Sequence, residues 1–216
     1  VDDFDLEKTI ALPDVCADIM TFYTKDKAYG YFMGGSLSLQ QMKELSFMED
    51  VKSIFGVRLR TGMLGNLFRC DVKDVNNARI TMSEALWNGR EIEEQMMEAS
   101  DFADRWKVMS SYLEQRIARN YKINNIVSYV VKEIINSQGC ITIRELEEKT
   151  GYTGRYLRKV VKEYLGISIK QFCEVTKFQW MCNYYKLREG DVSLPDLALQ
   201  AGYYDQSHMN LSCKKL

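Results

Sequence analysis

Four basic side chains that recur at helical spacing have the clearest capacity for chemistry in this sequence. These are Arg155, Arg158, Lys159 and Lys162. The surrounding residues 153–188 hold eight Lys or Arg against two acidic residues, a net charge of +6. On one helix face, such cations can bind phosphate oxygens and the acceptor edge of guanine. A basic stripe is also typical of an ordinary solvated helix face, so charge alone leaves both interpretations open.

Side chains suited to catalysis or metal binding are sparse. The chain has one histidine, His208, and six cysteines without a C-x-x-C pair, so we expect neither a zinc site nor a Ser-His-Asp triad. There is no glycine-rich phosphate loop either. The sequence therefore predicts a protein that is not an enzyme, with no catalytic residues, metal or cofactor. Scattered cysteines in a chain without a secretion signal favour reduced thiols in the cytoplasm. The sequence contains no apolar run of about 18 residues, so we expect no membrane-spanning helix.

The basic stripe falls on the second of two short helices that flank a glycine. Thr142-Ile-Arg-Glu145 is a capping box, which starts a helix. That helix ends at Gly151, since glycine readily adopts the positive φ of a tight turn. Thr153 is a good N-cap for the next helix, whose apolar residues follow i, i+3, i+4, i+7 spacing. These apolar residues are Leu157, Val160, Val161 and Tyr164. The arrangement predicts a helix-turn-helix unit.

The same pattern recurs 51 residues further along the chain. Glu145–Thr153 matches Asp196–Tyr204 at a leucine, a glycine and a tyrosine, and Ser193 caps the second copy. Between the copies, Ser168–Leu187 predicts a long helix with an apolar face that can hold the two units at a fixed separation. Two such units can enter major-groove segments about one helical turn apart.

Three segments resemble the tandem helix-turn-helix domain of the AraC/XylS family of transcription regulators: Gly151–Lys162, Leu165–Ser168 and Ala198–His208. The resemblance covers about the last 90 residues. It implies an all-α, homeodomain-like fold with DNA facing the second helix of each unit. It also gives His208 a role at a helix start or on a phosphate. The DNA-binding residues that the resemblance implies are Thr153, Arg155, Tyr156, Arg158, Lys159, Lys162, Gln206, Ser207, His208 and Asn210.

Several positions depart from the family's pattern. Glu147 stands where a small alanine usually packs against the turn, which predicts a looser first unit, and Lys177 replaces the usual arginine of the linking helix. Leu211 and Cys213 stand where arginine and phenylalanine are common, which predicts a second unit with weaker electrostatic reading. The chain does not start with methionine and stops at Leu216, before the family's usual final helix, so we expect a piece of a longer protein.

Residues 1–62 are predicted to be the β-rich part of a regulatory domain. Three β-like runs, Ala17–Thr24, Tyr29–Gly34 and Val51–Arg60, make a poor sheet alone, so we expect part of a barrel or sandwich. This region more weakly resembles the barrel-like regulatory half of some family members. Residues 1–100 carry 11 basic and 17 acidic side chains, a net charge of −6. Aromatic residues on the strands could line an effector pocket, but are more typical of a core: Tyr23, Tyr29, Tyr31 and Phe32.

Residues 63–120 are predicted to be the helical part of that domain, and residues 121–216 the DNA-binding domain. Apolar residues at 4-3 spacing run from Ile92 to Ile117, which favours either packing on the β module or a dimer interface. Ser100-Asp101 can divide the segment into two helices.

Together, these features predict an α+β protein. A partial β-barrel or sandwich-like module comes first, then helices, then an all-α tandem helix-turn-helix domain. The predicted function is an effector-responsive, bacterial, sequence-specific DNA-binding transcription regulator, with activation the commoner mode in the family. Its predicted partners are double-stranded promoter DNA, RNA polymerase, a small-molecule or protein effector at the N-terminal domain, and a second copy of the chain. One alternative is an adaptor that keeps the fold but reads little DNA. Another is a relative of the DNA-repair methyl acceptors, although those pair this domain with a clustered-cysteine zinc module that this chain lacks.

Overall fold

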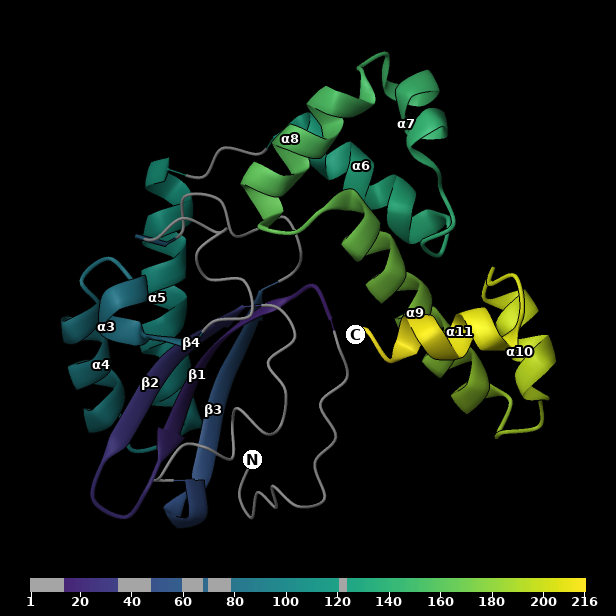
Figure 1. Ribbon diagram of the computed structural model, residues 1–216. Helices are drawn as coiled ribbons and strands as arrows, with labels where there is room; N and C mark the ends of the chain where they lie inside the picture. Colours follow the sequence, from purple (N-terminus) through teal and green to yellow (C-terminus); the bar gives the residue numbers. More distant parts are fainter. Residues whose placement is uncertain (1–13, 35–47, 60–67, 70–78, 121–123) are drawn as a thin grey trace. The chain divides into compact units, whose positions relative to one another are not determined.

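The computed structural model (Figure 1) describes residues 14–34, 48–59, 68–69, 79–120 and 124–216 of the chain. Contacts divide the chain into two compact units, the first formed mainly by Cys16–Ile123 and the second by Asn124–Glu163 and Ile167–Leu216. Within the described residues, the first unit contains the strands together with three α-helices, and the regular elements of the second unit are helices. This confirms the mixed α+β class. No helix of the described ranges has both the length and the apolar character needed to span a membrane.

An antiparallel sheet organises the first unit, with the strand order β3-β1-β2-β4. The strands are β1 (Ala17–Tyr23), β2 (Ala28–Gly34), β3 (Ser53–Leu59) and β4 (Arg79–Thr81), and a 3-10 turn, η1 (Met48–Asp50), precedes β3. In register, Ile19 of β1 lies opposite Phe32 of β2 and Val57 of β3. The three expected strands are confirmed over the residues described, and Arg60 lies outside them. The expectation of helix throughout 63–120 is wrong at β4, because three residues are too few to give a periodic signal.

Three helices pack on this sheet: α3 (Met82–Ala85), α4 (Gly89–Glu98) and α5 (Phe102–Asn120) (Figure 1). Their shared core joins Phe32 and Phe55 of the sheet to Met82, Met96 and Met109 of the helices. Complete burial of one such side chain contributes about 1.5–3 kcal/mol. Tyr23 also belongs to this core, and its hydroxyl donates to the Met96 carbonyl at 3.0 Å. Two of the aromatic residues considered for a pocket, Tyr23 and Phe32, therefore serve the core.

The long apolar seam of the predicted helical region is interrupted between α4 and α5. The expected break is confirmed, and the Asp101 carboxylate accepts a hydrogen bond from the Asp104 amide at 2.9 Å at the start of α5. In α4, the first seam residue, Ile92, is buried, and so is Met96 four residues later on the seam, but in α5 the buried residues are Met109 and Tyr112, which lie off it. Packing of the whole seam on the β module is therefore wrong for α5, because the break restarts the helical phase, and the alternative of a dimer interface stays a prediction. The exposed seam residues of α5 include Trp106 and Ile117.

The second unit is entirely helical in the part of the chain that the structure describes. Its elements are α6 (Asn125–Asn136), α7 (Ile143–Thr150), α8 (Gly154–Leu165), α9 (Ile169–Leu187), α10 (Leu194–Gln200) and α11 (Gln206–Cys213). The caps at Thr142 and Ser193, the stop at Gly151 and the long helix between the two pairs are confirmed, and Ser168 caps that long helix.

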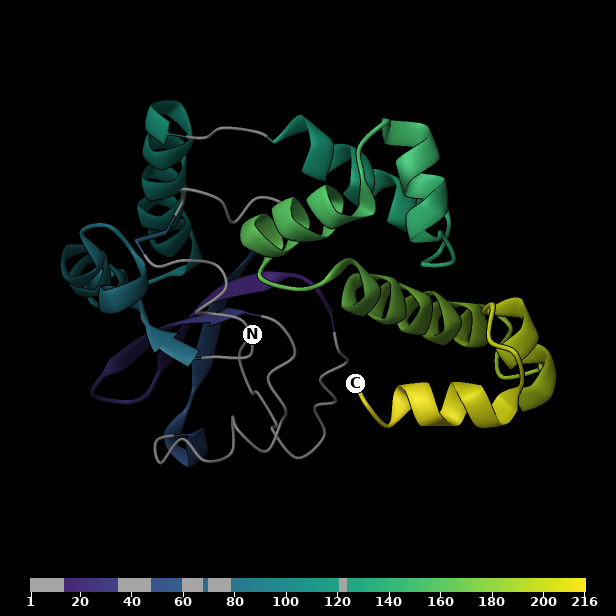
Figure 2. The same cartoon turned by 45° about the horizontal axis from the view of Figure 1, so that its top comes forward.

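Helix α9 contacts elements on both sides of it in the sequence. Near its start, Ile169 and Phe172 are buried, and the helix contacts α6. Near its end, Met181 joins a core cluster with Leu197 of α10 and Met209 of α11. Both views place α10 and α11 beside the C-terminal half of α9 (Figures 1 and 2). One helix thus supports the pair α7–α8, through α6, and the pair α10–α11 directly.

Candidate nucleic-acid interface

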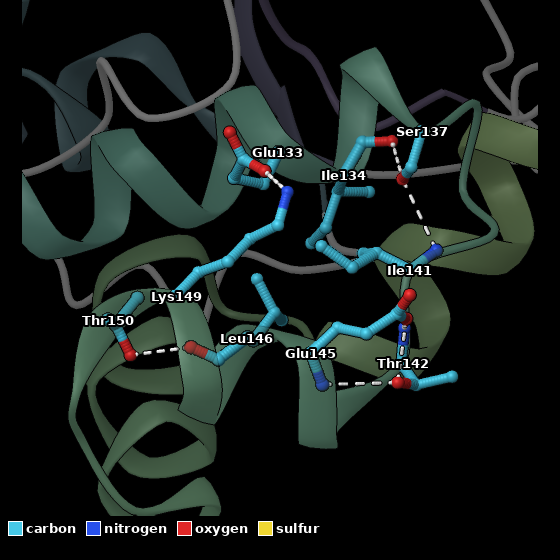
Figure 3. Close-up of polar contacts among 9 residues, drawn as sticks. All are labelled: Glu133, Ile134, Ser137, Ile141, Thr142, Glu145, Leu146, Lys149 and Thr150. Carbon is cyan, nitrogen blue, oxygen red and sulfur yellow. Dashed lines mark hydrogen bonds and ion pairs between the residues drawn. The ribbon is translucent and has the colours of Figure 1, made fainter.

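The start of α7 is fixed by a reciprocal cap (Figure 3). The Thr142 hydroxyl accepts from the Glu145 amide at 3.2 Å, and the Glu145 carboxylate accepts from the Thr142 amide at 2.7 Å. The backbone amide of Thr142, followed by its hydroxyl, lowers the pKa of the Glu145 carboxyl. An ionised carboxylate also suits the positive end of a helix dipole. Lys149 donates to Glu133 of α6, which ties α7 to its neighbour.

Gly151 ends α7 with a φ of 73°, and the chain turns directly into α8. The Thr153 hydroxyl accepts from the Tyr156 amide at 3.4 Å, so Thr153 caps α8 as predicted. The Glu147 carboxylate accepts from the Gly154 amide, a second cap on the same helix. A Cβ on Gly154 would lie 2.6 Å from Ile143 Cγ2 and 3.0 Å from Glu147 Oε1. The larger Glu147 is thus accommodated by a glycine opposite, and it bonds across the turn that we expected to be looser.

Helix α8 presents its basic side chains to solvent. Leu157 and Val161 are completely buried, as the apolar stripe predicts, and the opposite side carries the cations. Arg155, Arg158 and Lys162 are exposed, and within the described ranges no ion pair engages them. Lys159 is 3.9 Å from Glu163, a solvent-exposed pair that contributes little. Tyr152 and Tyr156 stack beside them with ring centroids 5.0 Å apart, and both are exposed. This face can bind an extended anion.

The second turn repeats this construction with different side chains. The Ser193 hydroxyl accepts from the Asp196 amide at 3.2 Å, and Gly202 follows α10 with a φ of 74°. Asp205 caps α11 by accepting from the His208 amide at 2.7 Å. His208 Nδ1 accepts from the Tyr204 amide at 3.3 Å. In the neutral ring the proton then sits on Nε2, where the exposed side chain can donate to an oxygen ligand.

The caps align the two pairs more accurately than the sequence repeat does. Thr153 and Asp205 are 52 residues apart, whereas the repeat has an offset of 51, because the second turn holds one more residue. Tyr203, which matches Tyr152 in the repeat, is 3% exposed, and its burial raises its pKa to about 12. Tyr204 is instead 85% exposed. The tyrosines matched by sequence are therefore not equivalent in position.

Each of the two helices has a row of solvent-exposed residues along one side, here called its outward line, and the two rows correspond at the 52-residue offset of the caps. On α8 the line is Arg155, Lys159 and Lys162, and on α11 it is Ser207, Leu211 and Lys214. Leu211 and Lys214 were not among the predicted DNA-facing residues. Leu211 was noted only as a departure from the family, although the arginine that is common at this position is itself a signal that the position faces outward.

The structure places the predicted site residues on two exposed surfaces of the second unit. All ten are solvent-exposed except Gln206, which is half-buried. One surface combines the start and outward face of α8, and the other the start of α11. The first group is Thr153, Arg155, Tyr156, Arg158, Lys159 and Lys162, and the second is Gln206, Ser207, His208 and Asn210.

Other reactive groups in the described residues do not form a comparable site. No group of three or more His, Cys, Asp or Glu side chains in these ranges is placed to hold a metal ion. Burial raises the pKa of the Cys173 thiol to about 11 and also raises that of Cys182. A buried thiol with a raised pKa is a poor nucleophile.

Comparisons with known proteins give this chain no relative. No protein-family model, curated protein or solved structure matched it. The AraC/XylS resemblance therefore stays a prediction that rests on the residues of this chain.

A separate cleft lies in the first unit, between α4 and α5. It is partly open to solvent and has a volume of about 560 Å³, within the range of small-molecule sites. Its lining includes Trp87, Glu91, Tyr112 and Arg116. The Arg116 guanidinium lies 4.9 Å from the centre of the Trp87 ring. The cleft thus offers an aromatic surface together with groups of both charges.

Proposed function

We propose that this protein is a sequence-specific DNA-binding transcription regulator of the AraC type. In this proposal, α7–α8 and α10–α11 are two helix-turn-helix units, and α8 and α11 are their reading helices. The observation that carries it is the repeated turn, in which an exposed helix face follows a positive-φ glycine and a side-chain cap in each pair. The unpaired cations of α8 supply the attraction for phosphates and guanine.

The partners follow from the same proposal. Double-stranded promoter DNA lies on α8 and α11, and the bound protein recruits RNA polymerase as a cytoplasmic activator. A small-molecule or protein effector acts on the first unit, where the cleft between α4 and α5 is a candidate site. A second copy of the chain would use α5, whose exposed Phe102, Trp106 and Ile117 support a dimer.

Selection from a pool of random duplex DNA, at low and moderate salt, tests the proposal. The wild-type protein should enrich a motif with two elements about one helical turn apart. Arg155→Ala and Arg158→Ala should each weaken binding to that motif and relax one element, a loss of roughly 1–3 kcal/mol for each bidentate base contact. Lys132→Ala removes one charge from an exposed position on α6 and is the matched control. Enrichment unaffected by either arginine change would refute the assignment.

A protein adaptor is the second candidate, and exposed apolar residues of the α10–α11 pair favour it. Leu199 is 61% exposed and Leu211 59%, and Tyr204, in the segment between the two helices, is 85% exposed. An adaptor should retain its protein partner when Arg155 and Arg158 are both changed to alanine, and should enrich no duplex motif in the selection.

A further inference from the structure

The two proposed reading helices occupy matching positions but present different chemistry. At the offset set by their caps, Lys159 of α8 corresponds to Leu211 of α11. Each side chain lies in the middle of its outward line, opposite the buried face of its helix. Leu211 is 59% exposed, so it serves no core in the described part of the chain. A leucine replaces a cation where the helix would meet DNA.

The neighbours of Leu211 are polar but uncharged until the end of the helix. Ser207 lies one turn before Leu211 on the outward line of α11. Asn210, which corresponds to Arg158 of α8, lies beside Leu211. Lys214 follows the last turn, while the carboxylate of Asp205 stands at the start. Since no Lys or Arg lies on α11 before Lys214, contacts with base edges would supply much of the binding energy of this surface.

Side chains of these types recognise particular base pairs in the major groove. Asparagine can bond both N6 and N7 of adenine, and an apolar side chain can pack on the C5-methyl group of thymine. Arginine and lysine instead favour O6 and N7 of guanine. The exposed His208 Nε2 can hold a phosphate at the start of α11, which would fix the helix while Asn210 and Leu211 face the bases.

We propose that α11 reads an A·T-containing element, with Leu211 packed on a thymine methyl group and Asn210 on adenine, while α8 reads an element that contains guanine. This inference rests on the proposed DNA-binding function and adds the base composition of each half of the target. It also assigns Leu211 as a specificity-determining residue.

The test combines motif selection with deletion of single methyl groups. Full-length wild type, Asn210→Ala and Leu211→Ala are each used to select from random duplexes. The element that loses definition in both variants is the one read by α11. Each thymine of that element is then replaced in turn by deoxyuridine, which lacks only the C5-methyl group, and binding is measured for wild type and Leu211→Ala.

A contact with the methyl group should appear as coupling between protein and DNA changes. One uridine replacement should weaken wild-type binding by about fourfold, the worth of one buried methyl group, but leave Leu211→Ala almost unchanged. Leu199→Ala, an equally exposed leucine on α10, should keep the wild-type response to uridine. Because Leu211 is exposed, its alanine variant should fold normally, which thermal unfolding checks.

Three outcomes would overturn the inference. An element dominated by G·C pairs, or uridine effects equal in wild type and Leu211→Ala, would refute the role of Leu211 and leave DNA binding standing. The absence of any enriched motif for wild type would refute both this inference and the proposed function.

Discussion

At the scale of single residues, the α7–α8 turn depends on a close fit between Gly154 and Glu147. A Cβ at position 154 would come within 2.6 Å of Ile143 Cγ2, closer than real contacts of this kind. We therefore expect Gly154→Ala to destabilise the protein by about 1–3 kcal/mol, although alanine is normally the better helix residue. Urea unfolding measures this loss.

A double-mutant cycle separates this clash from other causes. Ile143→Ala removes the obstructing Cγ2, so Gly154→Ala should cost much less in that background than in wild type. Equal costs in the two backgrounds would mean that the clash is not the source of the instability.

Glu93 of α4 makes the stability of the first unit depend on pH. Burial raises the pKa of this carboxyl above its ordinary value of 4.5, against hydrogen bonds from Ser83 that lower it. The folded state therefore binds the proton more tightly than the unfolded state. The resulting destabilisation is fully present above the folded pKa and disappears as the pH falls below 4.5.

Replacement of this carboxyl by an amide should accordingly stabilise the protein at neutral pH. Glu93→Gln keeps an oxygen that can accept from Ser83, and its gain should be under about 1 kcal/mol because the side chain remains partly exposed. Glu94→Gln, at an exposed position on the same helix, is the control. Thermal unfolding at pH 7 and pH 4 should give a gain only at the higher pH, and a gain of the same size at both would contradict the explanation.

At the scale of helices, side-chain caps fix where the proposed reading helices begin. Asp205 satisfies the His208 amide at 2.7 Å, and no other side chain of the described residues bonds that amide. Asp205→Ala should cost about 1 kcal/mol of stability, within the range measured for N-caps, while Asp205→Ser should stay near wild type because serine is an equally good cap. Chemical denaturation compares the variants, and an equal loss in both would assign the effect to charge rather than to capping.

Caps also explain how much of the fold was predictable. Local signals such as the Thr142 capping box, Gly151 and the Ser193 cap gave correct helix boundaries, because they act within one turn of the chain. The 4-3 spacing from Ile92 to Ile117 did not identify the buried residues of α5, since these depend on the break before Phe102 and on a sheet that is distant in sequence.

The sequence also identified part of the candidate site and missed another part. Arg155 and Lys162 were found from charge and spacing, and the structure leaves both exposed. Leu211 was interpreted only as a loss of charge, because apolar character alone cannot distinguish an outward leucine from a buried one. The one-residue insertion after Gly202 shifts the equivalence of the two turns, and the hydrogen bond that the Asp205 carboxylate accepts from the His208 amide reveals it.

At the scale of the whole molecule, the near-zero net charge does not reveal the cationic face of α8, which is the feature that matters for binding DNA. The chain carries 29 basic and 30 acidic side chains, yet residues 124–216 alone hold 13 Lys or Arg against 10 Asp or Glu. At physiological salt the screening length is about 8 Å, so a bound phosphate responds to nearby cations more than to the overall balance. The acidic first half therefore does not prevent α8 from binding a polyanion.

The salt dependence of binding to the selected duplex measures how many cations engage phosphates. Each phosphate neutralised contributes about −0.9 to the slope of log K against log salt for double-stranded DNA.

Lys162 is exposed near the end of α8, so it is better placed to contact a phosphate than a base. Lys162→Ala should therefore reduce the magnitude of the slope by about 1 and weaken binding to all duplexes alike. Lys132→Ala, which removes the same charge from α6, should leave the slope unchanged. A slope that falls equally in both variants would mean that the protein attracts DNA through its total charge, and not through the outward face of α8.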